Sequence, residues 1–300
     1  MVDDADGSEE GLVRIFESTW DGSNGTWTRL GSYINGETSG DEFGDAMDLD
    51  SAGTRIIIGA HQNDSWGQKT SKYANDPAQD DYLGYSVSVS GNYAIAGTPG
   101  DDSGGAVYIL YRASGSSTWS QQAKIEQSDE TAGDEFGGSV SISGDYIIVS
   151  AWKDDDGGSA SGSAYIFVRS GTSWSQQAKL VASDAAAGDY FGSDVSMSGD
   201  YAIIGSPGDD DGGSLSGSAY IFVRSGTSWS QQAKLVASDD AAGEFFGVNV
   251  SISGDYAIAG APVNQYSVPA YQLRDDDGGD GSGSAYILFE VVPVGPSRQS

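Results

Sequence analysis

Aspartate offers the most obvious chemistry in this sequence, because it recurs in short glycine-rich runs. The runs read PGDDSGG, KDDDGG, PGDDDGG and RDDDGG. Carboxylates at this density repel one another unless a cation or water screens them. Several hard oxygen ligands in one flexible loop are what Ca²⁺ prefers. The predicted calcium ligands are Asp101, Asp102, Asp154, Asp155, Asp156, Asp209, Asp210, Asp211, Asp275, Asp276 and Asp277.

The same runs have a simpler interpretation as solvated surface turns. Asp and Gly both favour turn conformations, and acidic loops keep a protein soluble. The residue types alone do not separate a calcium loop from a plain turn. Calcium binding is therefore a hypothesis, and the solvated turn is its alternative.

Catalytic groups are scarce. Cysteine is absent and His61 is the single histidine, which argues against Ser-His-Asp, Cys-His and multi-histidine zinc chemistry. We expect His61 to be a surface loop residue. The repeated carboxylates do not single out one acid and one base with separated pKa values, as glycoside hydrolysis requires. We therefore predict that the protein is not an enzyme.

The enzymatic alternative is a sialidase-like propeller that acts on glycans. The segment SGTSW resembles the Asp-box pattern SxDxGxTW, but it lacks the aspartate. No cluster of arginines that could bind a substrate carboxylate is evident in the sequence.

The aspartate runs belong to an internal repeat. The segment SGSAYIFVRSGTSWSQQAKLVASD occupies residues 161–184 and, unchanged, residues 216–239, which begin 55 positions later. Phe-Gly pairs that begin at residues 136, 191 and 246 follow the same spacing, and looser copies begin at Phe43 and Leu83. Five copies at such a period indicate a repeat architecture.

One period of the repeat predicts four short antiparallel strands, which we name A to D in chain order. SDVSMS alternates small polar with apolar residues, as a half-buried strand does, and YAIIGSP is the apolar run of an inner strand. SAYIFVR and WSQQAKLVA follow, and no helical period is present. Repeated four-stranded units are typical of propeller blades. We predict an all-β fold, a β-propeller of four-stranded antiparallel blades, about five in number with six as the alternative.

The copies resemble the FG-GAP repeats of integrin α-subunit propellers and of many secreted microbial proteins. The resemblance rests on FGGSVSISGDYIIVSA, FGSDVSMSGDYAIIGSPG and FGVNVSISGDYAIAGAP, where Phe-Gly opens strand A and Gly-Ala-Pro or a variant closes strand B. It extends over about residues 11–291. The resemblance implies a module for ligand binding or adhesion, located outside the cell or on its surface.

The family's calcium pattern is not kept in this chain. Integrin-type repeats carry D-x-D-x-D-G in the A–B hairpin, where this sequence has SGDY or SGNY. The nearest remnant is DLDSAG at residues 48–53. Calcium sites in this chain would therefore lie on the opposite face of the blades.

Strand order predicts which loops share a face. In an up-and-down blade the B–C and D–A loops lie on one face, which we call the loop face, and the A–B and C–D turns lie on the other. The aspartate runs are in B–C loops, so we predict that function resides on the loop face. The recurring Trp119, Trp174 and Trp229 are expected to pack between blades, whereas aromatic residues that break the repeat are better binding candidates. The candidate ligand-face residues are Trp152, Trp66, Asp134, Asp189 and Glu244.

The ends of the chain are less regular than its middle. Residues 11–292 are assigned to the propeller, residues 1–10 to an N-terminal extension and residues 293–300 to a C-terminal linker or tail. The first repeat starts in mid-blade and the last supplies no strand D, so we expect both termini to complete one blade. Such a tail also suits one module of a larger multidomain chain or assembly.

Charge limits the partners of the protein. The 300 residues carry 44 acidic and 14 basic side chains, a net charge of -30, so nucleic acid and anionic membranes would be repelled. No apolar run approaches the length of a membrane span, so we expect no direct membrane insertion. We expect a protein or glycan ligand on a cell surface or matrix, with Ca²⁺ as cofactor. The alternative is a structural spacer or assembly unit of a larger cell-surface protein.

Overall fold

The protein folds into β-strands throughout the part that can be described. The computed structural model describes residues 12–20, 25–35, 42–53, 55–61, 81–101, 104–116, 118–129, 131, 133–237, 242–261 and 284–288. These residues form β-strands and no helix, which confirms the all-β prediction. Accordingly, none of them belongs to a helix long and apolar enough to cross a membrane.

Three consecutive sheets have four antiparallel strands each, in chain order. Sheet 1 consists of β5 (Val87–Ser90), β6 (Tyr93–Thr98), β7 (Ala106–Tyr111) and β8 (Ser120–Ile125). Sheet 2 consists of β9 (Val140–Ser143), β10 (Tyr146–Ala151), β11 (Ser163–Ser170) and β12 (Ser173–Leu180). Sheet 3 consists of β13 (Val195–Ser198), β14 (Tyr201–Ser206), β15 (Ser218–Ser225) and β16 (Ser228–Leu235). The four strands of each sheet are the predicted strands A to D.

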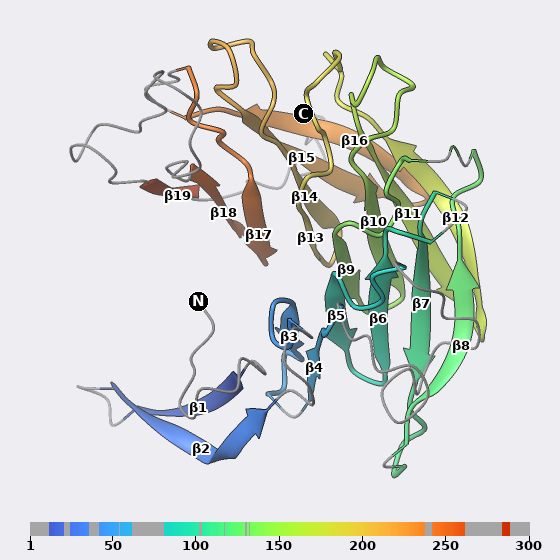
Figure 1. Ribbon diagram of the computed structural model, residues 1–300, viewed down its shortest axis with the longest axis vertical. Coiled ribbons are helices and arrows are strands. Elements are labelled where there is room, and N and C mark those ends of the chain that lie inside the picture. Colours follow the sequence, from blue (N-terminus) through green and yellow to red (C-terminus); the bar gives the residue numbers. More distant parts are fainter. Residues whose placement is uncertain are drawn as a thin grey trace, which may run out of the picture.

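Shorter sheets flank these three. The pairs are β1 (Leu12–Trp20) with β2 (Gly25–Asn35) and β3 (Met47–Leu49) with β4 (Ile56–Ile58), and a three-stranded sheet contains β17 (Asn249–Ser253), β18 (Tyr256–Ala261) and β19 (Ser284–Leu288). The sheets follow one another around an arc with the A strands on its inner side (Figure 1).

Closure of the arc into a ring stays a prediction. Within the described residues, no strand pairing joins β1 and β2 to the sheet of β17, β18 and β19. The predicted extension 1–10 and tail 293–300 lie outside the described residues.

The hydrophobic core lies between neighbouring sheets. Ile95 and Val107 of sheet 1 pack in one cluster with Phe136 and with strands β9 and β10 of sheet 2. Phe191 and Phe246 take the same fully buried position at the next two boundaries. The phenylalanines of the Phe-Gly pairs therefore pack between neighbouring sheets.

Hydrogen bonds between A strands explain why serine occupies every second position. The amide of Met197 in β13 donates to Ser141 Oγ in β9 (3.1 Å), and the amide of Ile252 in β17 donates to Ser196 Oγ in β13 (3.2 Å). The A strands line a polar cavity of about 590 Å³ on the inner side of the arc. Apolar residues of the A strands thus enter the cores between sheets, while the serine hydroxyls join neighbouring strands.

The Gly-Ser-Pro motif permits a close backbone approach between sheets. A Cβ added to Gly205 would lie 1.8 Å from the carbonyl oxygen of Gly247, the glycine of the next Phe-Gly pair. Gly247 itself has a φ of +88°, a conformation that favours glycine. Both motifs of the repeat therefore serve the contact between neighbouring repeats.

Candidate functional site

Two carboxylate clusters lie on the loop face, one at sheet 2 and one at sheet 3. Each takes one aspartate from the D–A loop that leads into the sheet and two from its B–C loop. Within each cluster, one carboxylate oxygen per residue lies within 4.8 Å of the others. The clusters consist of Asp129, Asp154 and Asp156, and of Asp184, Asp209 and Asp211. The predicted convergence of B–C and D–A loops is confirmed at these two sheets.

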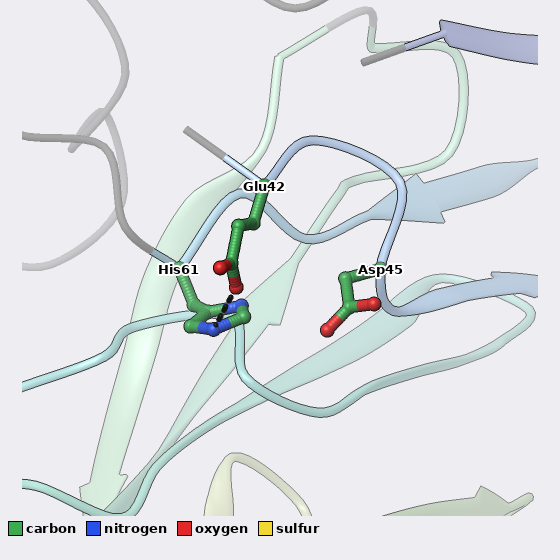
Figure 2. A group of neighbouring side chains, drawn as sticks. All are labelled: Glu42, Asp45 and His61. Carbon is green, nitrogen blue, oxygen red and sulfur yellow. Dashed lines mark ion pairs between the residues drawn. The ribbon is translucent and has the colours of Figure 1, made fainter. Parts of the chain in front are cut away.

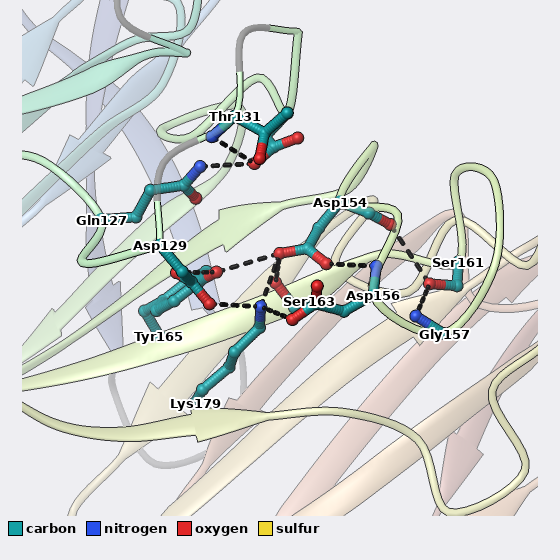
Figure 3. A network of polar contacts seen from close by, with 11 residues as sticks. Gln127, Asp129, Thr131, Asp154, Asp156, Gly157, Ser161, Ser163, Tyr165 and Lys179 are labelled. Atoms are coloured by element: carbon teal, nitrogen blue, oxygen red, sulfur yellow. Dashed lines mark hydrogen bonds and ion pairs between the residues drawn. The ribbon is translucent and has the colours of Figure 1, made fainter.

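A lysine from strand D holds the first cluster, which we call the Lys179 cluster. Lys179 Nζ lies 2.7 Å from Asp129 Oδ2, 2.8 Å from Asp154 Oδ2 and 2.6 Å from Asp156 Oδ2 (Figure 3). The Tyr165 hydroxyl group, from β11, is hydrogen-bonded to Asp129 (2.8 Å) and Asp154 (2.9 Å). The cluster therefore fastens the incoming D–A loop to the B–C loop of the same sheet.

The second group, the Lys234 cluster, repeats this arrangement in sheet 3. Lys234 Nζ lies 2.8, 2.8 and 2.6 Å from Asp184, Asp209 and Asp211, and Tyr220 takes the place of Tyr165. The sequence prediction included the B–C loop aspartates but not the lysines. The missed signal was the motif QQAK, which recurs at 55-residue spacing and contains Lys124, Lys179 and Lys234.

The lysine also controls the ionisation of its cluster. Burial disfavours the charged form of Asp154, but hydrogen bonds from Lys179, the Asp156 amide and Tyr165 outweigh it and lower the pKa of Asp154. The pKa of Asp129 is lowered in the same way, against burial, by Lys179 and Tyr165. For Lys179 itself, burial acts against the ammonium ion, but its three carboxylate partners raise its pKa. The cluster is thus three carboxylates around one ammonium ion.

The other predicted calcium ligands lie apart from these clusters. Asp155 is exposed and accepts a hydrogen bond from the Ala160 amide (2.6 Å), as a turn residue does, and Asp210 is also exposed. Asp101 forms an ion pair with Lys124 in sheet 1 (2.8 Å). Calcium binding stays a prediction. The candidates outside the described residues are Asp102, Asp275, Asp276, Asp277 and Trp66.

Three candidate ligand-face residues are buried, which corrects their predicted role. Asp134 and Asp189 are each 4% exposed, and Glu244 is 2% exposed. Asp134 accepts hydrogen bonds from the Gln127 side chain and the Thr131 amide (Figure 3 shows these two partners), and Asp189 accepts one from a loop amide. Burial raises the pKa of Asp134 and of Asp189. The carboxylates of Asp134 and Asp189 therefore close the D–A loops from inside, and at these exposures none of the three can face a ligand.

Trp152, by contrast, is a half-buried residue of the loop face, directly after β10. Its ring packs against that of Tyr190 in the next D–A loop (centroids 5.5 Å apart), and Lys153 Nζ lies 4.5 Å from its centroid. Lys153 also forms an ion pair with Glu135. Tyr190 and the Lys153 side chain are 36% and 39% exposed. We call Glu135, Trp152, Lys153 and Tyr190 the Trp152 patch.

The tryptophans that recur in strand D stabilise contacts between sheets. Trp174 Nε1 donates to Gln122 Oε1 of sheet 1 (3.2 Å), and Trp229 Nε1 donates to Gln177 Oε1 of sheet 2 (3.1 Å). The ring of Trp174 also meets that of Tyr93 in sheet 1 edge-on. The prediction that these residues pack between blades is confirmed for both tryptophans.

Comparisons with known proteins identify the repeat but no function. The family model described as FG-GAP repeat matches residues 66–111, 119–167, 174–222 and 229–289, more than half of the chain. No curated protein sequence matches the chain. Among solved structures, a leech intramolecular trans-sialidase complexed with 2,7-anhydro-Neu5Ac is similar at 8% sequence identity and a TM-score of 0.34. This likeness covers 83% of the present chain but only 38% of the sialidase chain, and it is too weak to bear on activity.

Proposed function

Because the chain belongs to the FG-GAP repeat family, we propose that it is a non-catalytic, propeller-like binding module of an extracellular or cell-surface protein. Its ligand is a protein or a glycan that contacts the loop face at the Trp152 patch. The resemblance to integrin α-subunit propellers supports the ligand-binding role.

One departure from an otherwise uniform repeat carries this proposal. Sheets 2 and 3 have identical C and D strands, and their B–C loops share the run Asp-Asp-Asp-Gly-Gly. Pro207 and Gly208 of sheet 3, however, correspond to Trp152 and Lys153 in sheet 2. Since the equivalent loop of sheet 3 folds with Pro-Gly at these positions, the fold does not require an aromatic and a cationic side chain in sheet 2. Both side chains are partly exposed, where a ligand can reach them.

The residues that contact Trp152 and Lys153 also differ between sheets 2 and 3. A Cβ added to Gly138 would lie 3.0 Å from Trp152 Cδ1, so the glycine leaves room for the ring. The equivalent residue of sheet 3 is Ser193. Lys153 pairs with Glu135, an acid that sheet 3 also lacks at this position. These linked differences indicate a local adaptation rather than a single random substitution.

The Trp152 patch offers an aromatic surface flanked by opposite charges. Aromatic rings contact the apolar face of a sugar or the apolar side chains of a protein, and Trp and Tyr are enriched at binding hot spots. Lys153 and Glu135 can donate and accept hydrogen bonds at the rim of such a contact. The Asp clusters, which recur as equivalent copies bound to lysines, offer no single acid and base for catalysis.

A binding screen with a variant that restores the repeat tests this proposal. Wild-type protein and the W152P/K153G variant, which has the Pro-Gly pair of sheet 3, are compared on a glycan array and against purified matrix proteins. We expect at least tenfold weaker ligand binding by the variant. Tyr256→Ser removes a 57% exposed aromatic side chain at the A–B turn on the opposite face, and this control should bind like the wild type. Equal binding by all three proteins contradicts the proposed surface, and a wild type without ligands favours the structural spacer.

Calcium stabilisation is a second proposal, motivated by the grouped carboxylates. The oxygen donors of the Lys234 cluster suit Ca²⁺, but the ammonium group of Lys234 already lies among them, 2.8 Å from Asp209 Oδ2. A calcium ion would therefore have to displace this lysine.

Thermal unfolding with and without calcium tests the second proposal. Binding to the folded state alone adds about 2–3 kcal/mol to the free energy of unfolding at a hundredfold excess over Kd. The melting temperature should then rise with millimolar Ca²⁺ by more than with Na⁺ at matched ionic strength. The rise should shrink in the D209N/D211N variant. If the calcium-induced rise in melting temperature is unaltered in that variant, or if the wild type shows no rise, the clusters do not bind Ca²⁺ and are turns held by a lysine.

A further inference from the structure

A histidine and two carboxylates meet beside the sheet of β3 and β4, where the repeat departs twice from its pattern. His61 follows β4 at the position that proline takes in three other copies. Asp45 follows the Phe-Gly pair of the same copy, at a position where no other copy has an acidic residue. Figure 2 shows that both side chains point toward the same space as Glu42. Two departures in one copy therefore converge in the folded chain.

These three side chains are close enough to bind one ion. His61 Nε2 lies 2.7 Å from Glu42 Oε2, and one ligand atom each from Glu42, Asp45 and His61 lies within 4.8 Å of the others. The rings of Tyr82 and Tyr85 meet the histidine ring edge-on, with centroids 6.2 and 5.1 Å away. The histidine is thus held in place between two tyrosines and a carboxylate.

The environment of His61 differs from that of a surface loop residue, which corrects the sequence expectation. Its side chain is 6% exposed, whereas that of Glu42 is 43% exposed. Nε2 is paired with Glu42, but Nδ1 is buried and has no hydrogen-bond partner in the part of the chain that the structure describes. A buried nitrogen without a hydrogen-bond partner costs free energy, and the ion pair at Nε2 does not give Nδ1 a partner.

We propose that Glu42, Asp45 and His61 form a binding site for a divalent transition metal ion, represented by Zn²⁺. Imidazole nitrogen and carboxylate oxygen are common zinc ligands, and three protein ligands with one water complete a tetrahedral site. Ca²⁺ takes oxygen ligands only, so this site selects another class of metal than the aspartate clusters would. A bound ion gives both carboxylates and the imidazole a shared partner, and the packed tyrosines limit rotation of the ring.

Zinc binding by variants of the full chain tests this assignment. The chain is treated with a chelator, dialysed and titrated with zinc chloride by isothermal titration calorimetry, and the zinc retained after dialysis is measured by mass spectrometry. We expect one zinc ion bound at this site in the wild type. Asp45→Asn changes an exposed side chain and should weaken binding at least tenfold. His61→Pro, which restores the residue found as Pro99 and Pro207, should weaken it by a similar factor.

A matched control comes from the repeat itself. Glu135 occupies in sheet 2 the position of Glu42, but that copy has tryptophan in place of the histidine. Glu135→Gln should therefore bind zinc like the wild type. Failure of the wild type to retain zinc, or zinc binding that Asp45→Asn leaves unchanged, overturns the proposal. The asparagine variant decides the outcome if circular dichroism shows that His61→Pro does not fold.

Discussion

The Lys179 cluster and the Trp152 patch share the B–C loop of sheet 2, but only the cluster recurs in sheet 3. The contacts of the Lys179 cluster recur at Lys234 with distances of 2.6–2.8 Å in both copies. The Trp152 patch has no such counterpart in sheet 3, which has Pro207 and Gly208 at the corresponding positions. In the cluster one ammonium ion is bound by three carboxylates, whereas the patch keeps its aromatic and charged groups partly exposed. Recurrence thus marks groups that the fold needs, and departure from the repeat marks candidates for function.

The largest expected contrast is between two tryptophans. Trp174→Ala removes packing between sheets 1 and 2 and the hydrogen bond to Gln122, and should lower the free energy of unfolding by about 4 kcal/mol. Trp152→Ala should lower it by less than about 1 kcal/mol, because the loop tolerates proline at the equivalent position. Urea unfolding followed by circular dichroism measures both. Equal losses of free energy of unfolding in the two variants would mean that Trp152 also stabilises the fold, and would contradict the distinction between recurring and non-recurring residues.

Two lysines provide a somewhat smaller contrast. Lys179→Met removes the ammonium group from the buried Asp154 and should cost about 3 kcal/mol, at the low end for buried pairs since the Lys179 side chain is 19% exposed. Lys153→Met breaks an exposed pair with Glu135 and should cost about 0–1 kcal/mol. Guanidinium unfolding at pH 7 measures the difference. A loss at Lys153 as large as that at Lys179 would contradict the distinction between cluster and patch.

The smallest expected effect is the pH dependence of stability. Hydrogen bonds outweigh burial and lower the pKa of Asp129, Asp154 and Asp184, so their stabilisation is complete above the ordinary value of 3.8 and is lost as the pH falls through the folded-state pKa. Burial raises the pKa of Asp134 and Asp189, so their protonation in the folded state adds stability as the pH falls toward 3.8. The free energy of unfolding should therefore rise slightly in mild acid and then decline in stronger acid.

Urea unfolding between pH 7 and pH 3 measures this profile. The Lys179→Met variant should show a smaller decline in strong acid, because its aspartates have lost the donor that lowers their pKa. Lys153→Met is the control and should keep the wild-type profile. If the free energy of unfolding of Lys179→Met declines in strong acid as steeply as that of the wild type, Lys179 is not the cause of the decline.

The strands were predictable because their signals are local. The segment SDVSMS contains β13 (Val195–Ser198), and YAIIGSP contains β14 (Tyr201–Ser206), since alternation and the Ser-Gly-Asp turn act over a few residues. The candidate site was partly predictable for the same reason. Asp154 and Asp209 do lie in clusters, because short B–C loops bring their carboxylates close to those of the D–A loops.

The sequence by itself determined the strands, the 55-residue period and the loops in which the acids gather, because each depends on neighbours along the chain. Only the tertiary structure decided what those acids contact. Lys179 lies 25 positions from Asp154 and 50 from Asp129, so their meeting depends on the pairing of strands within the sheet and on how the D–A loop is placed against it. The same packing buried Asp134, Asp189 and the ring of His61, which composition and spacing had assigned to the surface. Burial and the identity of a charged partner depend on long-range packing, which no local pattern encodes.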